Sequence, residues 1–404
     1  MTDPLAEPVA PVRRPWVAWL FLANLGLWLG IYAPLQVLLP QQVELLDPVR
    51  KEFLFGLVTG VGAVVALVVN PLVGRCSDRT TSRWGRRHPW TLGGALVGAA
   101  GLAVLASAAS TAAVVAGWCL AQAGLNGMLA ALTSAVPDRV PVGQRARVGG
   151  LVGISQMLGT VVGAVLVTVL VSGLSAGYWA CAAAVVLGAA AFVLRTPDAR
   201  LPEAARPAPR GGSLLPRWRP DFAWAWGAHF AINLGNGFGT LYLLYFLDDV
   251  VRHPSPADGL LVLMLLYGVA LVAGAVVLGA RSDRSGKRRG YVHLAAAAMA
   301  LAALLLAVWP TWTAALVAAP LLGAGFGGYW AVALALLTQV LPAAEDRARD
   351  LGVVNVANSL PQVLAPLLTP AVLAHLGGYR GLFLVSAAVT VSAALLVGRV
   401  RSVR

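Results

Sequence analysis

Residues 77–87 read SDRTTSRWGRR, and residues 282–289, about half the chain later, read SDRSGKRR. A duplicated half of the chain predicts two similar domains that follow one another. Other short sequences repeat in the same order, which supports this duplication. These pairs are FLANLG at 21–26 with FAINLG at 230–235, and QRAR at 144–147 with DRAR at 346–349.

The composition is that of a membrane protein. Of the 404 residues, 58% are hydrophobic and 12% are charged, and the mean hydropathy is +0.76. A soluble domain has about 45–50% apolar and about 25% charged residues, so an ordinary soluble enzyme, a disordered chain and a nucleic-acid-binding module are excluded. Because about 20 apolar residues span a bilayer, the chain has room for roughly a dozen spans.

Apolar runs separated by Gly, Pro and Arg clusters predict an all-α protein with twelve transmembrane helices in two pseudo-symmetric six-helix bundles. The expected helices lie at 16–40, 53–74, 90–109, 112–136, 148–172, 177–194, 222–247, 259–280, 291–309, 313–341, 350–374 and 379–398.

The longest stretch without an apolar run, residues 195–221, is rich in Pro, Gly and Arg and is expected to be a flexible cytoplasmic linker. It separates an N-terminal bundle at 16–194 from a C-terminal bundle at 222–398. Residues 1–15 and 399–404 are expected to be cytoplasmic tails.

The basic residues follow the topology that twelve spans impose. With the N-terminus in the cytoplasm, 26 of the 30 Lys and Arg residues fall on the cytoplasmic side, as the positive-inside rule requires. The sequence therefore predicts a multi-pass protein of the inner, cytoplasmic membrane with both termini inside. This distribution also accounts for the net charge of +13 without any nucleic-acid partner.

The repeated loop carries a family resemblance. It resembles the signature loop of the major facilitator superfamily, and the sequence SDRTTSRWGRRHPW is similar to the same loop in the sucrose and glycoside–cation symporters. The matching residues are Gly74, Asp78, Arg79, Gly85, Arg86 and Arg87 in the first copy and Gly279, Asp283, Arg284, Gly286, Lys287 and Arg288 in the second.

The resemblance implies a gating role for these loops. Asp78 would meet the start of the helix at 350–374 when the cytoplasmic side is closed, and Asp283 would meet the start of the helix at 148–172. Arg145 and Arg347, which precede those two helices, join the gating candidates. The alternative for the arginines of the loops is that they only set the topology.

The substrate candidates are polar or aromatic residues inside the expected spans, where burial in lipid would be costly unless they face a cavity between the two halves. Several share a helix face through spacings of three or four residues. The candidates are Asn24, Trp28, Tyr32, Gln122, Asn126, Gln156, Asn233, Asn236, Tyr329, Trp330, Asn358 and Gln362. The alternative for each amide is a hydrogen bond between helices that has no role in binding.

Acidic residues are absent from the middle of the spans. All 17 lie in tails, loops or span ends. Glycoside–cation symporters of the kind that the loop resembles use acids in the helix that corresponds to 53–74, which has none here, so sodium coupling at that place is not expected. His229, on a cavity-type helix face, is the candidate for proton coupling. A neutral hydrogen-bonding role for His229 and uncoupled diffusion remain alternatives.

We therefore expect a transporter, and not an enzyme, that moves a sugar or glycoside by alternating access. The alternatives are an efflux transporter for a drug or secondary metabolite, and a membrane receptor that transports nothing. No Walker loop, zinc-ligand spacing or Ser–His–Asp pattern is present. Gly323, Gly325 and Gly328 match a dinucleotide motif but lie in an apolar run, which favours close helix packing. The expected partners are the solute, a candidate proton and lipid, for a monomer without cofactor or metal.

Overall fold

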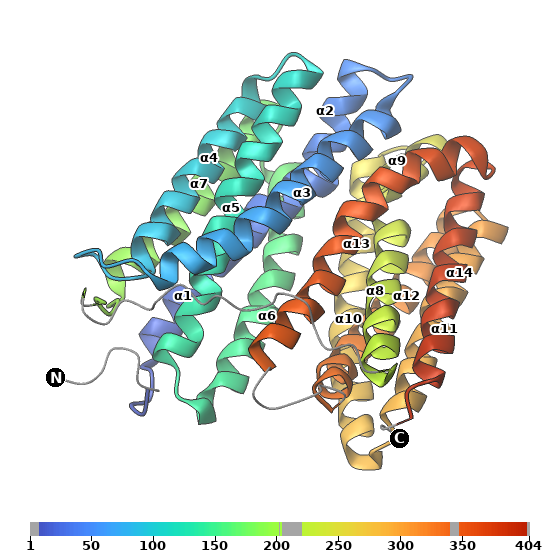
Figure 1. Ribbon diagram of the computed structural model, residues 1–404. Coiled ribbons are helices and arrows are strands. Elements are labelled where there is room, and N and C mark those ends of the chain that lie inside the picture. Colours follow the sequence, from blue (N-terminus) through green and yellow to red (C-terminus); the bar gives the residue numbers. More distant parts are fainter. Residues whose placement is uncertain (1–7, 202, 204–219, 340–346, 402–404) are drawn as a thin grey trace. The chain divides into compact units, whose positions relative to one another are not determined.

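The computed structural model describes residues 8–201, 203, 220–339 and 347–401. Within these ranges the long elements are all helices, and the predicted all-α fold is confirmed (Figure 1). Twelve helical segments of the described chain are long and apolar enough to cross a membrane. By its contacts the chain divides into unit 1, Met1–Arg210, and unit 2, Gly211–Arg404. The division falls within residues 195–221.

Each unit contains six of these segments, some of which are built from two or three consecutive helices. Unit 1 comprises α1 (Arg14–Ala33), the π-helical turn η1 (Pro34–Leu38), α2 (Leu39–Leu46), α3 (Lys51–Asp78), α4 (His88–Ser107), α5 (Thr111–Arg139), α6 (Val142–Val165), the π-helical turn η2 (Leu166–Leu170) and α7 (Leu174–Arg195). Unit 2 comprises α8 (Pro220–Thr240), α9 (Leu243–Asp249), α10 (Pro256–Ser285), α11 (Arg288–Val308), α12 (Trp312–Gln339), α13 (Arg347–His375) and α14 (Gly378–Gly398).

The two units repeat the same helix packing. In unit 1, α1 packs against α6 and α7, α4 packs against α5 and α7, and α3 packs against α5. In unit 2 the equivalent pairs are α8 with α13 and α14, α11 with α12 and α14, and α10 with α12. Every main contact of one unit thus has its counterpart in the other, as the sequence repeat predicts.

Glycine allows the closest of these contacts. A Cβ atom on Gly124 of α5 would lie 2.0 Å from the backbone nitrogen of Gly98 on α4, and one on Gly323 of α12 would lie 2.2 Å from the carbonyl oxygen of Tyr267 on α10. Backbones can approach this closely only where the side chain is absent. The dinucleotide-like glycines of α12 therefore serve helix packing, as expected.

Several predicted helix ends are wrong: the span predicted at 16–40 continues to Leu46, and two other errors concern the repeated loop. The helix predicted at 53–74 continues to Asp78, and the one predicted at 259–280 continues to Ser285. Gly74, Asp78, Gly279 and Asp283 accordingly lie in the last turns of α3 and α10 and not in loops. These helices continue past the hydrocarbon region of the membrane. Their last residues are polar, so the apolar pattern in the sequence ends before the helix does.

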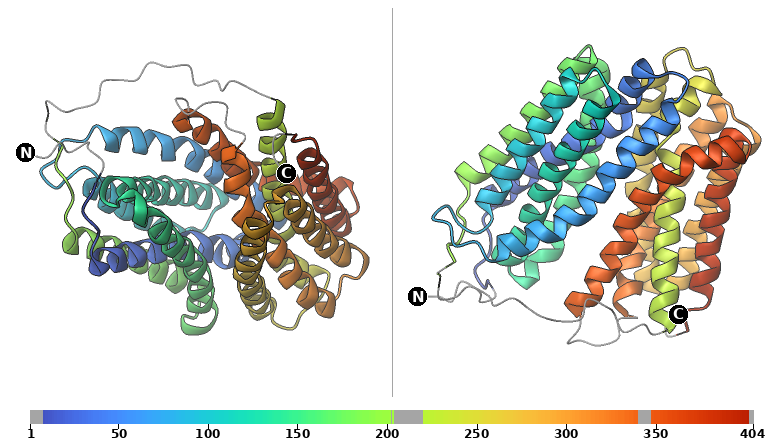
Figure 2. Two further views of the ribbon diagram at one scale, coloured as in Figure 1. Left: turned by 90° about the horizontal axis from the view of Figure 1, so that it is seen from below. Right: turned by 45° about the horizontal axis from the view of Figure 1, so that its top comes forward.

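Proline bends α13 in unit 2. Pro361, Pro366 and Pro370 lie inside this helix, and its bend is visible in Figure 1 and in the right-hand view of Figure 2. Pro370 has no N–H group to donate to the carbonyl of Pro366, four residues earlier. The hydroxyl of Tyr242, at the break between α8 and α9, donates to that carbonyl instead, at 3.1 Å.

Candidate functional site

A buried polar cluster in unit 2 joins three helices. His229 of α8 is only 1% exposed. Its Nδ1 lies 2.5 Å from the hydroxyl of Tyr329 on α12, and its Nε2 is hydrogen-bonded to Oδ1 of Asn358 on α13. The indole of Trp330 meets the imidazole edge-to-face, with ring centres 5.5 Å apart. The structure thus brings together four of the residues proposed from the sequence.

The partners of His229 determine which protonation states it can adopt. The amide oxygen of Asn358 can only accept, so Nε2 carries a proton, and Nδ1 of the neutral ring then accepts from the Tyr329 hydroxyl. If Nδ1 also gained a proton, it would donate to the phenolic oxygen once the hydroxyl hydrogen had turned away. Both the neutral and the charged ring can therefore keep two hydrogen bonds. The cluster contains no carboxylate, so nothing in it neutralises the charged form.

A second polar pair lies further along α8. Oδ1 of Asn236 accepts from the hydroxyl of Tyr267 on α10, at 3.1 Å. Tyr267 was not among the predicted residues, because a single tyrosine within the apolar run of α10 has no neighbour in sequence to mark it. Asn233 and Gln362 bond back to carbonyls of their own helices, to His229 at 2.8 Å and to Asn358 at 3.5 Å. Gln362 and Trp330 are also partly exposed, Trp330 by 42%.

Polar residues of unit 1 gather along α1. The rings of Trp28 and Tyr32 stack at 5.7 Å with an angle of 22° between their planes. The hydroxyl of Tyr32 is hydrogen-bonded to the side chain of Gln156 on α6. Asn24 is buried and donates to the carbonyl of Leu20 in its own helix, at 2.8 Å. Trp28, Tyr32 and Gln156 thus form one group, whereas the Asn24 amide is satisfied locally.

The side of α5 that faces α3 is filled by an aromatic ring. Trp118 of α5 is fully buried, and a Cβ atom on Gly62 of α3 would lie 2.4 Å from its indole. One turn along α5, Gln122 and Asn126 bond to each other at 2.7 Å. The described residues of α3 between its first and last turns carry no acid, and the indole occupies the space beside Gly62.

The loop between α3 and α4 is organised around Arg87. The guanidinium, only 4% exposed, bonds to carboxylate oxygens of Asp138 at 2.7 Å and Asp78 at 2.6 Å and to the hydroxyl of Ser77 at 2.7 Å. Arg86 shares Asp138, at 2.5 Å. Burial lowers the pKa of Arg87, but hydrogen bonds and charges, first of Asp138 and then of Asp78, outweigh burial and raise this pKa. The cluster therefore joins the end of α3, the loop and the end of α5.

The start of the expected linker is not free but bound to the same loop. The carboxylate of Asp198 accepts the backbone N–H groups of Arg87 at 2.5 Å and His88 at 2.8 Å, at the N-terminus of α4. The hydroxyl of Thr196 lies 3.2 Å from Nε2 of His88. An anion at a helix N-terminus satisfies donors that have no partner within the helix. The prediction of a flexible linker is therefore wrong for residues 196–198; residues 202 and 204–219 lie outside the described part of the chain.

The other gating candidates have varied surroundings. Arg145 donates to the carbonyls of Val140 at 3.0 Å and Pro137 at 3.2 Å, and so caps the end of α5. Nε of Arg79 is buried and has no partner among the described residues. Arg284 is exposed. The side chains of Asp283 and Arg347 lie outside the described residues, so their predicted roles stay predictions.

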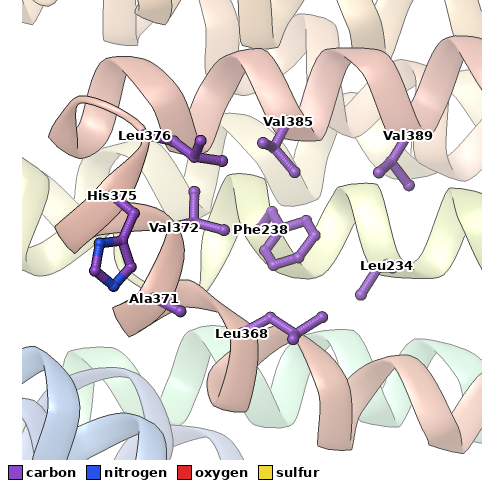
Figure 3. Close-up of a pocket in the computed structure, with 9 residues that line it drawn as sticks. All are labelled: Leu234, Phe238, Leu368, Ala371, Val372, His375, Leu376, Val385 and Val389. Carbon is purple, nitrogen blue, oxygen red and sulfur yellow. The ribbon is translucent and has the colours of Figure 1, made fainter.

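An apolar groove with a volume of about 360 Å³ lies between α8, α13 and α14 of unit 2 (Figure 3). Phe238 contributes an aromatic ring to its lining, and the His375 imidazole lies at one end. The other lining residues are aliphatic: Leu234, Leu368, Ala371, Val372, Leu376, Val385 and Val389. None of the predicted substrate residues lines this groove, which offers a hydroxyl-rich solute almost no hydrogen-bond partner.

Comparison with known proteins identifies related sequences. The model of the family described as Major Facilitator Superfamily matches residues 50–276 and 252–404. An uncharacterized symporter of Synechocystis is 51% identical over 41 residues, which are 10% of this chain and 8% of the symporter. A lactose permease of Lactobacillus helveticus is 42% identical over 55 residues, which are 13% of this chain and 9% of the permease. The chain thus matches only a small part of either relative.

Solved structures share the fold over nearly the whole chain. A mutant of the nucleoside transporter NupG has a TM-score of 0.74 at 14% identity, and the match covers 95% of this chain and 99% of that one. The human organic anion transporter MFSD10 has a TM-score of 0.71 at 19% identity, with 96% and 100% covered. A bacterial homolog of the human lysosomal transporter Spinster has a TM-score of 0.71 at 16% identity, with 96% and 97% covered.

Proposed function

The chain belongs to the Major Facilitator Superfamily of membrane transporters, and from this premise we propose that it moves a sugar or glycoside by alternating access. The observation that carries the proposal is the chemistry of the polar clusters. Trp330 lies beside His229, which bonds to Asn358, in unit 2. Trp28 and Tyr32 stack in unit 1, where Tyr32 bonds to Gln156. Aromatic faces with a few amide and hydroxyl groups suit a neutral ligand with apolar ring faces and many hydroxyl groups.

The distribution of charge supports a neutral solute. In the described parts of the spans, the acids lie within the first or last turn of their helices, as Glu52, Asp78 and Asp138 do. A charged solute would need an opposite charge where water is excluded, because an uncompensated ion there is costly. The similarity of one segment to a lactose permease agrees with a saccharide. We infer a saccharide and not an ionised metabolite.

We further propose that His229 takes up a co-transported proton. His229 is hydrogen-bonded to Tyr329 on α12 and to Asn358 on α13. A change of its charge therefore acts on both helices at once. Because the hydroxyl of Tyr329 can either donate or accept, the ring can gain a proton without losing a hydrogen bond. The added charge then favours whichever conformation solvates it better.

The orientation and the gate complete the proposal. The predicted concentration of Lys and Arg on one side supports cytoplasmic termini in an inner membrane. The Asp78 carboxylate is 55% exposed although it is paired with Arg87, so it can accept a second partner when the protein changes state. We propose that Asp78 acts there as a gating residue and that the protein works as a monomer.

The test is uptake of labelled sucrose and maltose by the full chain in proteoliposomes, with and without an inward proton gradient. Uptake that rises with the gradient supports a proton-coupled saccharide symporter. Uptake that ignores the gradient supports a facilitator and contradicts the role of His229. Absence of uptake in both conditions contradicts the saccharide proposal, and efflux of apolar drugs from the same vesicles would then be measured.

A matched pair of variants tests the proton site. We expect His229→Ala to abolish gradient-driven accumulation while saccharide exchange continues, because exchange needs no net proton movement. His293→Ala is the control, since His293 is exposed and its hydrogen bond within the described part of the chain is to the backbone carbonyl of Arg289 in its own helix. Accumulation that survives in His229→Ala would assign the coupling to another group.

A further inference from the structure

Two polar atoms on the first span of unit 1 are buried without a hydrogen-bond partner among the described residues. They are the indole Nε1 of Trp28, a donor, and the side-chain Oε1 of Gln36, an acceptor. Polar atoms that are buried in proteins are almost always paired, because an unpaired one loses its hydration without compensation. The two atoms therefore call for a partner, and Gln36 was not among the residues proposed from the sequence.

The two atoms lie along one stripe of the span. Trp28, Tyr32 and Gln36 are four residues apart, so they follow one another on nearly the same helix face. Successive spacings of four residues drift around an α-helix. Gln36 lies in the π-helical turn η1, where more residues per turn counteract that drift. The stripe therefore remains in line from Trp28 to Gln36.

The neighbouring helices hold this stripe in place. Tyr32, between the two unpaired residues, stacks on Trp28 and bonds to Gln156 of α6. The turn η1 packs against α7 and against η2, the π-helical turn that follows α6.

Pro34 begins η1 and Pro40 follows it, and neither can donate a backbone hydrogen bond. Turns of this type are frequent at functional sites.

The spacing and the chemistry together describe a ligand. At about 1.5 Å per residue, Trp28 and Gln36 are separated by about 12 Å along the helix axis, which is more than one pyranose ring spans and comparable to two linked rings. A hydroxyl group can accept from the indole N–H and can also donate to an amide oxygen. A sugar hydroxyl could pair with Gln36 whichever way its amide is turned, because a hydroxyl can donate to the amide oxygen or accept from the amide NH2 group.

Building on the proposed function, we propose that Gln36 contacts the substrate and that Trp28, Tyr32 and Gln36 hold a disaccharide along the first span. One sugar hydroxyl pairs with Nε1 of Trp28 and a hydroxyl of the other ring pairs with the Gln36 amide. A monosaccharide at Trp28 does not reach Gln36. The stripe thus makes the protein selective for a two-ring saccharide over a single ring.

The experiment measures the Kd of sucrose, maltose and glucose for the purified full chain in nanodiscs, by calorimetry. We expect Gln36→Leu to weaken disaccharide binding about 10-fold, as the loss of one good hydrogen bond does, and to leave the Kd of glucose within twofold. Trp28→Phe keeps an aromatic ring but removes the indole N–H donor. This variant should weaken the binding of the disaccharides and of glucose. Gln36→Leu should also unfold at the same temperature as the wild type or higher without ligand, because it removes an unpaired buried acceptor.

Gln42→Leu is the matched control. Gln42 lies six residues further along and is fully paired: it donates to the carbonyl of Leu105 at 2.8 Å and accepts from Tyr178 at 2.7 Å. We expect this variant to unfold at a lower temperature and to keep the wild-type Kd values. An unchanged disaccharide Kd in Gln36→Leu would overturn the role of Gln36 while the saccharide proposal stands. If the wild type binds neither disaccharide, both proposals are wrong.

Discussion

Gly85 lies against Asp198 in the loop before α4. The backbone of Gly85 has a φ of +98°, a conformation that residues with a side chain rarely adopt. A Cβ atom there would also lie 2.3 Å from a carboxylate oxygen of Asp198. The glycine of the loop is thus required both by its backbone conformation and by the carboxylate that binds the N-terminus of α4.

We expect Gly85→Ala to destabilise the protein by roughly 1–3 kcal/mol, the range for a residue forced into a strained backbone conformation, with a further cost from displacing Asp198. Gly93→Ala is the control: Gly93 lies in α4, and a Cβ atom there would meet nothing within 4 Å, so the change should be neutral or slightly stabilising. Thermal unfolding in detergent compares the two. Equal melting temperatures would show that Asp198 does not constrain this position.

Residue periodicity predicted much of the candidate site but not its pairings. The spacing of His229, Asn233 and Asn236 placed them on one face of a helix, but it did not identify Tyr329 and Asn358 as the partners of His229. Such pairs depend on how three helices pack, which a single sequence does not encode locally. Tyr267 was missed because it is a lone polar residue in an apolar run, recognisable only from its neighbours in space. Gln36 continues the four-residue spacing of Trp28 and Tyr32, but it lies close to the expected end of the span at residue 40 and was not included.

At the scale of elements, the sequence predicted the twelve spans well and their ends poorly. Hydropathy detects the part of a helix that crosses lipid, whereas the helix continues into the polar region, as α3 does to Asp78. Proline was also a weaker signal than expected. Pro34 and Pro40 did not end the first span, because η1 accommodates the missing donors within a continuous helical segment.

One hydrogen bond joins the break between α8 and α9 to the bend of α13. Tyr242→Phe removes the donor to the Pro366 carbonyl, and we expect a cost of about 1–3 kcal/mol for a buried acceptor left unpaired. In a Pro370→Ala background the alanine N–H can bond to the same carbonyl, so the cost of Tyr242→Phe should largely disappear. Unfolding of the four proteins of this double-mutant cycle measures the coupling, and strictly additive effects would rule out the exchange of donors.

At the scale of the whole molecule, the two units share a packing plan but differ in their loops. The hydroxyl of Ser77 is paired with Arg87 in unit 1, whereas the hydroxyl of its repeat, Ser282, is buried and has no partner among the described residues. Arg289, the last arginine of the second loop, donates instead to the carbonyl of Gly398 at the end of α14. The second loop is three residues shorter, which changes where its last arginine can reach.

The difference between the loops can be tested by comparing the last arginine of each. We expect Arg87→Ala to cost roughly 2–4 kcal/mol of unfolding free energy, because it leaves Asp138 and Asp78 without their buried partner. Arg289→Ala removes one solvent-exposed hydrogen bond and should cost less than about 1 kcal/mol. Equal losses in chemical unfolding would contradict the asymmetry of the two loops.

The absence of acids from the middle of the spans has an electrical consequence. A fixed negative charge in the core would cross the membrane field when the empty carrier returns, but the described core holds none. In the proposed cycle the carrier loaded with one proton and a neutral saccharide would therefore move the full elementary charge across the bilayer, and the empty carrier would return without charge. A potential of 100 mV contributes about 2.3 kcal/mol per charge, so membrane voltage would drive accumulation alongside the pH difference, and transport would register as a current.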